Sequence, residues 1–212
     1  MKKFSLIIIF ISILFNNFIF LNLQSQINNI IIVKVGESLI TSLDVENEII
    51  TNLIIKKQEI NQASVNNNKK YAVKNLINKS IKKSEINKYE IKDYNKQDLK
   101  NYVQNIAKEL NTDSKGLKNI FKQSNIDYEV FLENYKIELL WNTLIFQYYK
   151  NQTNINTVDL ENEIEKIKDN KTEEEVKKIR KNFLEKKKQE KLNLFSRSHF
   201  ANLENTIVID FQ

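Results

Sequence analysis

The stretch of sequence that decides the fold reads Val33-Lys34-Val35-Gly36-Glu37-Ser38-Leu39-Ile40-Thr41-Ser42-Leu43-Asp44. It completes a β-branched run that starts at Asn29, and such a run ending at a glycine predicts a strand over residues 29–35. Thr41 and Asp44 have the spacing of a capping box, in which two side chains satisfy the first amides of a helix. The stretch therefore predicts a strand, a tight turn and a helix that reaches about Gln58.

Helical patterns fill most of the chain that follows. A polar stretch over residues 61–68 predicts a loop, and apolar residues at helical spacing then predict a helix from about Lys69 to Lys88. Residues that favour N-caps precede each later helical segment. These caps are Asn95, then Thr112 or Asp113, then Asp127 for a helix to about Lys150, Thr157 for one to about Lys168, and Thr172 for one to about Asn202.

A second β-branched run, from Thr206 to Phe211, closes the chain. Two strands at opposite ends of a helical chain must satisfy their main-chain hydrogen-bonding groups. The simplest arrangement pairs them with each other. We therefore predict a mainly α module closed by a small two-strand pairing of its N- and C-terminal strands.

The first 26 residues have the layout of an export signal. Lys2 and Lys3 precede an apolar stretch from Phe4 to Phe15, a second apolar stretch runs to Leu23, and Gln24 begins a polar exit. We predict a signal peptide over residues 1–26. If it is not cleaved, residues 4–23 are long enough to anchor the chain in a bilayer. In both cases the rest of the chain is expected in the periplasm.

The composition excludes several classes of chemistry. The 212 residues contain no Cys, no Pro, one His and two Gly. A phosphate-binding loop needs several glycines, and a zinc or iron–sulfur site needs clustered Cys and His. We therefore expect no cofactor and no metal.

The net charge is +6, from 33 basic and 27 acidic residues, and the basic residues are 31 lysines and only two arginines. Because arginine is the residue that grips bases and phosphates in a bidentate way, we expect no nucleic-acid partner.

Three stretches in order resemble the N-terminal module of SurA-type periplasmic chaperones. The first is the strand, turn and helix start at residues 33–44. The second is the helix with Leu76-Ile77, Ile81 and Glu85-Ile86, which is similar to a Leu-Ile … Leu … Glu-Ala block of the family. The third resembles its Asn-Ile-Ala … Gly-Ile-x-Tyr-x-x-Phe block and comprises Asn105-Ile106-Ala107, Leu117, Ile126-Asp127-Tyr128, Phe131, Ile137, Leu139 and Leu140.

The chain departs from this family in what it lacks. Family members carry one or two parvulin-type prolyl isomerase domains before the terminal helix, whereas here residues 169–171 bridge that point directly. The resemblance thus implies the chaperone core without the isomerase, and we expect no enzyme. The predicted organisation is one helical chaperone module over residues 27–212. Its N-terminal core spans 27–168, and a C-terminal helix and strand over 169–212 complete it.

Aromatic residues concentrate on the predicted helix after Asp127. At helical spacing most of them are typical of a core. The alternative is that some line an open crevice for extended client segments, because aromatic side chains offer a large contact area with few rotors. The candidate peptide-binding residues are Phe131, Tyr135, Trp141, Phe146 and Tyr149. The single histidine, His199, has no catalytic partner in a recognisable motif and is interpreted as structural.

The resemblance implies an ATP-independent periplasmic holdase that binds unfolded outer-membrane proteins or other exported polypeptides. Outer-membrane strands alternate apolar and polar residues, which suits such a partner. Two alternatives stay open. A peptidyl-prolyl isomerase-family protein would catalyse cis–trans exchange in a proline peptide, and a membrane-anchored periplasmic scaffold would keep its Met1-Lys2-Lys3 end, which mass spectrometry would detect.

Overall fold

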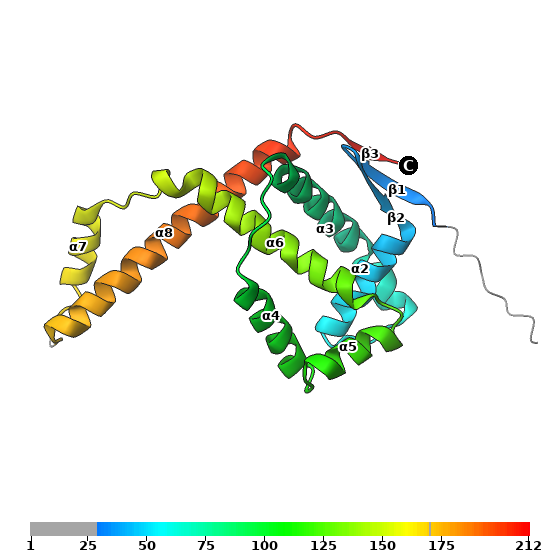
Figure 1. Ribbon diagram of the computed structural model, residues 1–212, viewed down its shortest axis with the longest axis horizontal. Helices are drawn as coiled ribbons and strands as arrows, with labels where there is room; N and C mark the ends of the chain where they lie inside the picture. Colours follow the sequence, from blue (N-terminus) through cyan, green and yellow to red (C-terminus); the bar gives the residue numbers. More distant parts are fainter. Residues whose placement is uncertain (1–28, 170) are drawn as a thin grey trace, which may run out of the picture.

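The computed structural model describes residues 29–169 and 171–212. The signal or anchor predicted over residues 1–26 lies outside this range. The described residues form a helical body next to a small sheet, with a helical arm that leaves the body on the side away from the sheet (Figure 1). The prediction of a mainly α fold is confirmed.

The sheet joins the two ends of the described chain. Strand β1 (Ile31–Val35) lies in the centre, between β2 (Ser38–Thr41) and β3 (Ile209–Phe211), and both pairings are antiparallel. The predicted pairing of the terminal strands is confirmed. The prediction of only two strands was incomplete. The described sheet has three strands, because residues 38–41 fold back on β1 across a two-residue turn and form β2. Gly36 takes a φ of 55° in this turn, which favours glycine.

Helices α2 (Ser42–Ile55) and α3 (Gln62–Lys88) pack on each other and on the sheet. The capping box that starts α2 is present, with Thr41 and Asp44 bonding each other's backbone amides. A buried cluster joins these elements through Val33 and Val35 of the sheet, Ile49 and Leu53 of α2 and Ile81 of α3. Phe200 and Leu203, near the chain's end, pack against the same cluster.

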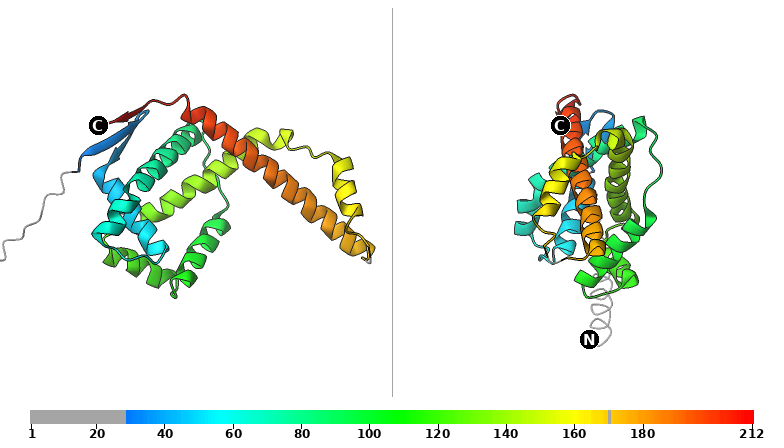
Figure 2. Two further views of the ribbon diagram at one scale, coloured as in Figure 1. Left: turned by 180° about the vertical axis from the view of Figure 1, so that it is seen from behind. Right: turned by 90° about the vertical axis from the view of Figure 1, so that its left-hand side faces the viewer.

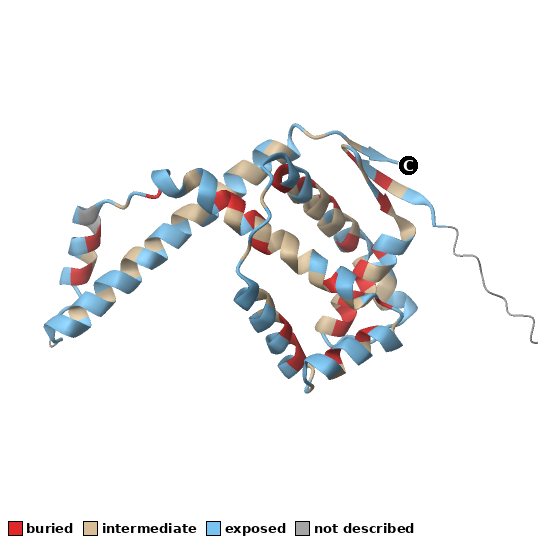
Figure 3. Ribbon diagram, in the orientation of Figure 1, coloured by how far each residue is buried: buried red, intermediate tan, exposed pale blue. Residues whose placement is uncertain are grey.

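Helices α4 (Lys96–Glu109) and α5 (Ser114–Gln123) precede α6 (Tyr128–Tyr149), which crosses the body beside α3. Asn95, Asp113 and Asp127 cap these three helices, as the sequence predicts. A second buried cluster forms where α2, α4, α5 and the start of α6 meet, and a third joins the far end of α6 to α3 and the terminal helix. Buried residues accordingly concentrate in the body (Figure 3).

The arm consists of α7 (Thr157–Glu165) and the outer half of α8 (Glu173–Glu204), connected to α6 through the short helix η1 (Lys150–Gln152). The inner half of α8 returns to the body, and the outer half extends away from it (Figure 2). No described residue of α8 is fully buried. Arg180 and Lys187 of α8 form ion pairs with Glu161 and Glu163 of α7 at 2.7 and 3.3 Å.

Two features of the arm follow from its sequence. The capping box of Thr172 and Glu175 starts α8 as predicted. The polar run from Glu185 to Lys191 lies off the body, where Lys191 donates to the backbone oxygen of Asn154 at 2.9 Å. In the described part of the chain, no helix has the length and apolar character needed to cross a membrane.

Candidate functional site

An apolar groove opens on the body beside the sheet. Its volume is about 510 Å³, within the range of ligand pockets in proteins. One wall comes from α2, the other from the first half of α3, and β1 contributes Ile32. The lining residues are Ile32, Ser42, Val45, Glu46, Ile49, Ile50, Ile60, Val65, Lys69 and Val73. Seven of these ten are Ile or Val, so the groove suits apolar side chains.

Helical spacing produces these walls. Val45 and Ile49 lie one turn apart on α2 and are buried, so they form the floor. Val65, Lys69 and Val73 follow one another at four-residue intervals on α3. Because residues four apart share a helix face, each row presents two apolar side chains to the space between the two helices, with Lys69 between Val65 and Val73 on α3.

The mouth of the groove forms at the start of α3. Asn61 caps this helix by accepting a hydrogen bond from the Ser64 amide at 2.9 Å. Ile60 and Val65 flank the cap at the positions of a hydrophobic staple, and both line the groove. Ile60 is 48% exposed, which leaves apolar surface open to a partner.

Three polar residues, Ser42, Glu46 and Lys69, line the groove. Glu46 and Lys69 stand on opposite walls and give the groove one charge of each sign. Ser42 bonds the backbone amide of Ile30 through its hydroxyl at 3.2 Å. Nowhere in the described part of the chain do three or more His, Cys, Asp or Glu residues gather as a metal site would require. The groove therefore presents an apolar surface with one acidic and one basic side chain in its lining.

None of the five predicted peptide-binding aromatics lines the groove. Phe131 and Tyr135 both pack on Tyr102 and line a smaller pocket of about 180 Å³, whereas Trp141 and Tyr149 both contact His199. Phe131 and Trp141 are buried in two different clusters, and Trp141 donates its indole N–H to Ser196 at 2.8 Å. Tyr135 stacks on Tyr102 with ring centroids 3.5 Å apart. The burial of Phe131 and Trp141 leaves little of either side chain for a client to contact in this conformation.

The other two aromatics lie near the base of the arm. Phe146 is 54% exposed and offers its ring to solvent. Tyr149 stacks on Phe195 of α8, with centroids 4.6 Å apart and rings 5° from parallel. Exposed Tyr148 contacts Tyr89 edge-on at 5.7 Å. Peptide binding by the five residues stays a prediction, and Phe146 has the most accessible ring among them.

His199 sits at the same junction and joins three helices. Its Nε2 lies 3.1 Å from the Glu85 carboxylate of α3, and its Nδ1 lies 2.9 Å from the Tyr149 hydroxyl of α6. Burial raises the pKa of Tyr149, and the neighbouring Tyr148 and Tyr89 raise it further. This network agrees with a structural interpretation of the histidine, because each of its ring nitrogens is engaged.

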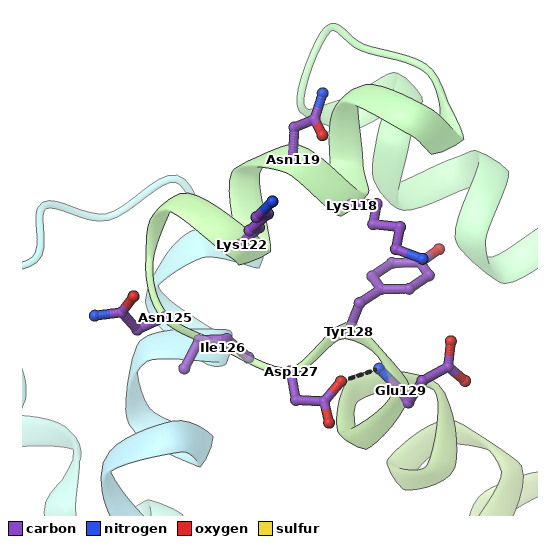
Figure 4. Close-up of a pocket in the computed structure, with 8 residues that line it drawn as sticks. All are labelled: Lys118, Asn119, Lys122, Asn125, Ile126, Asp127, Tyr128 and Glu129. Atoms are coloured by element: carbon purple, nitrogen blue, oxygen red, sulfur yellow. Dashed lines mark hydrogen bonds between the residues drawn. The ribbon is translucent and has the colours of Figure 1, made fainter.

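A second pocket, of about 500 Å³, lies where α5 meets α6 (Figure 4). Lys118 and Lys122 stand close to the N-terminus of α6, an arrangement that elsewhere attracts anions. Here Asp127 already accepts the Glu129 amide at 2.9 Å, and Glu129 adds another carboxylate to the lining. Lys118 lies over the Tyr128 ring, 5.8 Å from its centroid. The pocket is balanced in charge and does not favour an anion.

The groove was missed from sequence for an identifiable reason. The polar stretch over residues 61–68 predicts a loop, whereas α3 starts at Gln62, so Val65 is part of a helix face. The signal that would have revealed this is the Asn61 cap with Ile60 and Val65 around it. Val45 and Ile49 lie four residues apart in a segment predicted to be helical, so the α2 wall follows from the sequence pattern, whereas the α3 wall requires the helix to start before Val65.

Comparison with known proteins gives few matches. No family model matches the sequence, and no curated protein matches it. Among solved structures, one match is a chain from work on the virulence factor PEB4 and the periplasmic protein Cj1289 of Campylobacter jejuni, described as two structurally related SurA-like chaperones. It is 16% identical, covers 87% of this chain and 99% of its own length, and has a TM-score of 0.42.

Proposed function

We propose that this chain is an ATP-independent periplasmic holdase that binds unfolded outer-membrane-type polypeptides, with the apolar groove as its main contact. The observation that carries the proposal is the groove itself: an open surface of Ile and Val side chains with one acidic and one basic residue among them. The order of the three sequence blocks after a predicted export signal supports the same function. We also propose that the chain works by binding alone and not as an enzyme.

The groove fits the chemistry of such clients. Outer-membrane strands alternate apolar and polar residues, so an extended segment places apolar side chains on one side and polar ones on the other. The apolar ones enter between α2 and α3, and the polar ones remain near Glu46, Lys69 and solvent. Binding of the unfolded chain lowers its free concentration by mass action, which slows aggregation without nucleotide hydrolysis.

The test is suppression of aggregation of an unfolded outer-membrane barrel protein, followed by light scattering. The informative variant is Ile60→Lys, because Ile60 is half exposed and its replacement puts a charge at the mouth of the groove. Loss of part of one isoleucine contact corresponds to about fivefold weaker binding. We expect the variant to need about five times more protein for the same suppression.

The matched control is Leu194→Lys on α8. Leu194 is 63% exposed and lies outside the groove lining, so the same change of chemistry is made elsewhere on the surface. It should suppress aggregation as well as the unmodified protein does. Failure of the unmodified protein to slow aggregation would overturn the holdase function. If both variants lose the same amount of aggregation suppression, the groove is not the surface that binds the client.

Phe146 allows a separate test of the aromatic prediction. A photoreactive residue at position 146 should crosslink to a bound client if the exposed end of α6 contributes to binding. The same probe at Val130, an exposed residue at the other end of α6, serves as the control. Equal crosslinking at the two positions would argue against a role for the aromatic end of the helix.

A further inference from the structure

The outer edge of β3 presents main-chain groups that have no partner among the described residues. The Gly36 amide donates to Val208 at 2.9 Å, and the Gln212 amide donates to Ile32 at 3.0 Å. Lys34 is the register partner of Asp210 between them. In an antiparallel ladder the residues alternate, so residues 208, 210 and 212 direct their main-chain groups toward β1. Ile209 and Phe211 therefore direct theirs away from the sheet.

The opposite edge of the sheet is closed by the fold. On β2, the Thr41 amide donates to the Asp44 carboxylate at 2.8 Å, and α2 begins at the next residue. This leaves Leu39 as the residue of β2 whose main chain faces outward, since the Val35–Ser38 pair closes the hairpin. The two edges of the sheet therefore differ: within the described strands, β3 has two residues with outward-facing main-chain groups, Ile209 and Phe211, and β2 has Leu39.

The β3 edge has two of the features that protect an edge strand, a length of only three residues and the charged Asp210, but it has no proline. In Figures 1 and 2 no helix or strand of the described chain covers the outer side of β3. Val208 is 74% exposed and Phe211 is 65% exposed. The edge thus combines free hydrogen-bonding groups with apolar side chains.

The side chains of the edge specify what pairs with it. Ile209 and Phe211 share one face of the sheet with Val35 and Val33, and Asp210 lies on the other face beside Lys34. A second copy of the strand pairing in full antiparallel register would place two Asp210 side chains opposite each other, and like charges in that position are destabilising. A strand with a basic residue opposite Asp210 and apolar residues on either side is complementary.

We propose that the outer edge of β3 is a strand-addition site for an extended polypeptide segment in which apolar residues alternate with basic ones. Main-chain bonds to Ile209 and Phe211 hold the segment, and Asp210 selects its charge. Recognition of this kind takes affinity from the backbone and specificity from alternate side chains. The site is distinct from the apolar groove, and its occupation does not depend on holdase activity.

The experiment measures binding of a labelled, capped decapeptide of alternating valine and lysine by fluorescence anisotropy. Phe211→Pro removes one outward amide without removing a ladder bond, and Phe211→Ala removes the same side chain but keeps the amide. We expect Phe211→Pro to bind the peptide about 2- to 10-fold more weakly than Phe211→Ala. A peptide in which glutamate replaces lysine should bind more weakly to the unmodified protein, and N-methylation of alternate amides should abolish binding.

Amide hydrogen exchange in the unmodified protein provides a readout that does not depend on a variant's folding. The amides of Ile209 and Phe211 should gain protection when the peptide is added. Equal binding by the proline and alanine variants, or unchanged exchange at both amides, would overturn the proposal. So would self-association of the chain that Phe211→Pro abolishes, since this assigns the edge to a second copy. Each outcome leaves the aggregation test of the groove to be judged separately.

Discussion

At the scale of single residues, the hydrogen bonds between Glu85, His199 and Tyr149 join three helices. These residues belong to α3, α8 and α6, and both Glu85 and His199 are nearly inaccessible to solvent. Glu85 has a second partner in Lys88, at 3.3 Å, but Lys88 itself is exposed. A buried carboxylate that loses a hydrogen-bond partner costs more than a surface ion pair contributes.

His199→Leu should therefore lower the free energy of unfolding by about 1–3 kcal/mol, because Glu85 and Tyr149 each lose a partner. Lys88→Ala removes the other contact of the same carboxylate and should cost less than about 1 kcal/mol, since that pair is largely solvated. Urea denaturation of the two variants measures both values. Equal losses would mean that the histidine contributes no more than a surface charge.

Tyr102 makes the stability of the fold depend on pH in the alkaline range. Burial, with smaller contributions from the neighbouring Tyr135, Glu48 and Glu109, raises the pKa of its phenol to about 12. The phenol is neutral when protonated, and its pKa is higher in the folded state than the ordinary value of 10.0. Its contribution to stability is therefore complete below pH 10 and is lost as the pH rises from about 10 to about 12.

Tyr102→Phe should remove this part of the alkaline loss of stability, because phenylalanine keeps the ring that stacks on Tyr135 but has nothing to ionise. The measurement is the urea unfolding free energy as a function of pH in both proteins. The difference between their curves should be flat below pH 10 and change above it. A difference that is flat throughout would contradict a raised pKa at this position.

At the scale of elements, most helix starts were predictable because they depend on a few neighbouring residues. One predicted cap was wrong: Asn156, and not Thr157, caps α7, and it accepts a hydrogen bond from the Val158 amide at 3.0 Å. Thr41 with Asp44 and Thr172 with Glu175 form the expected capping boxes, and Asp113 caps where the sequence left Thr112 as an alternative. Caps act through hydrogen bonds to amides two or three residues away, so the sequence alone contains the required geometry.

The elements that were missed depend on contacts distant in sequence. Strand β2 is only four residues long, and its formation depends on pairing with β1. The first turns of α3 are polar. Their helical conformation is stabilised by the side-chain cap of Asn61 and by packing against α2. The candidate groove requires both walls at once. Its α2 wall was visible in the sequence, but the α3 wall appeared only after the two helices were placed together.

The predicted peptide-binding aromatics of α6 also show that contacts distant in sequence decide which side chains are accessible. A helical pattern shows that Phe131, Trp141 and Phe146 recur on one segment, but it does not show which neighbour covers each one. Phe131 is covered by α4 and α5, and Trp141 by α3 and α8, while Phe146 stays exposed. Three positions of similar character in the sequence therefore have different accessibility in the fold.

At the scale of the whole molecule, the body and the arm differ in how they are held together. The body has three clusters that draw on several helices and the sheet. The arm depends on one helix pair, in which Leu160 and Ile164 of α7 are buried against a terminal helix that has no buried residue among those described. Local stability follows the density of buried apolar contacts, so the arm is expected to open more readily than the body.

Two truncations to alanine separate these units. Leu160→Ala should raise amide hydrogen exchange along α7 and the outer half of α8 and should leave the urea midpoint of the body unchanged, because its contacts lie within the arm. Leu53→Ala, in the fully buried cluster beneath the sheet, should lower the global unfolding free energy by about 2–5 kcal/mol and raise exchange throughout the body. If Leu160→Ala shifts the body's midpoint as well, arm and body unfold as one cooperative unit, and the arm does not move independently of the groove and the sheet.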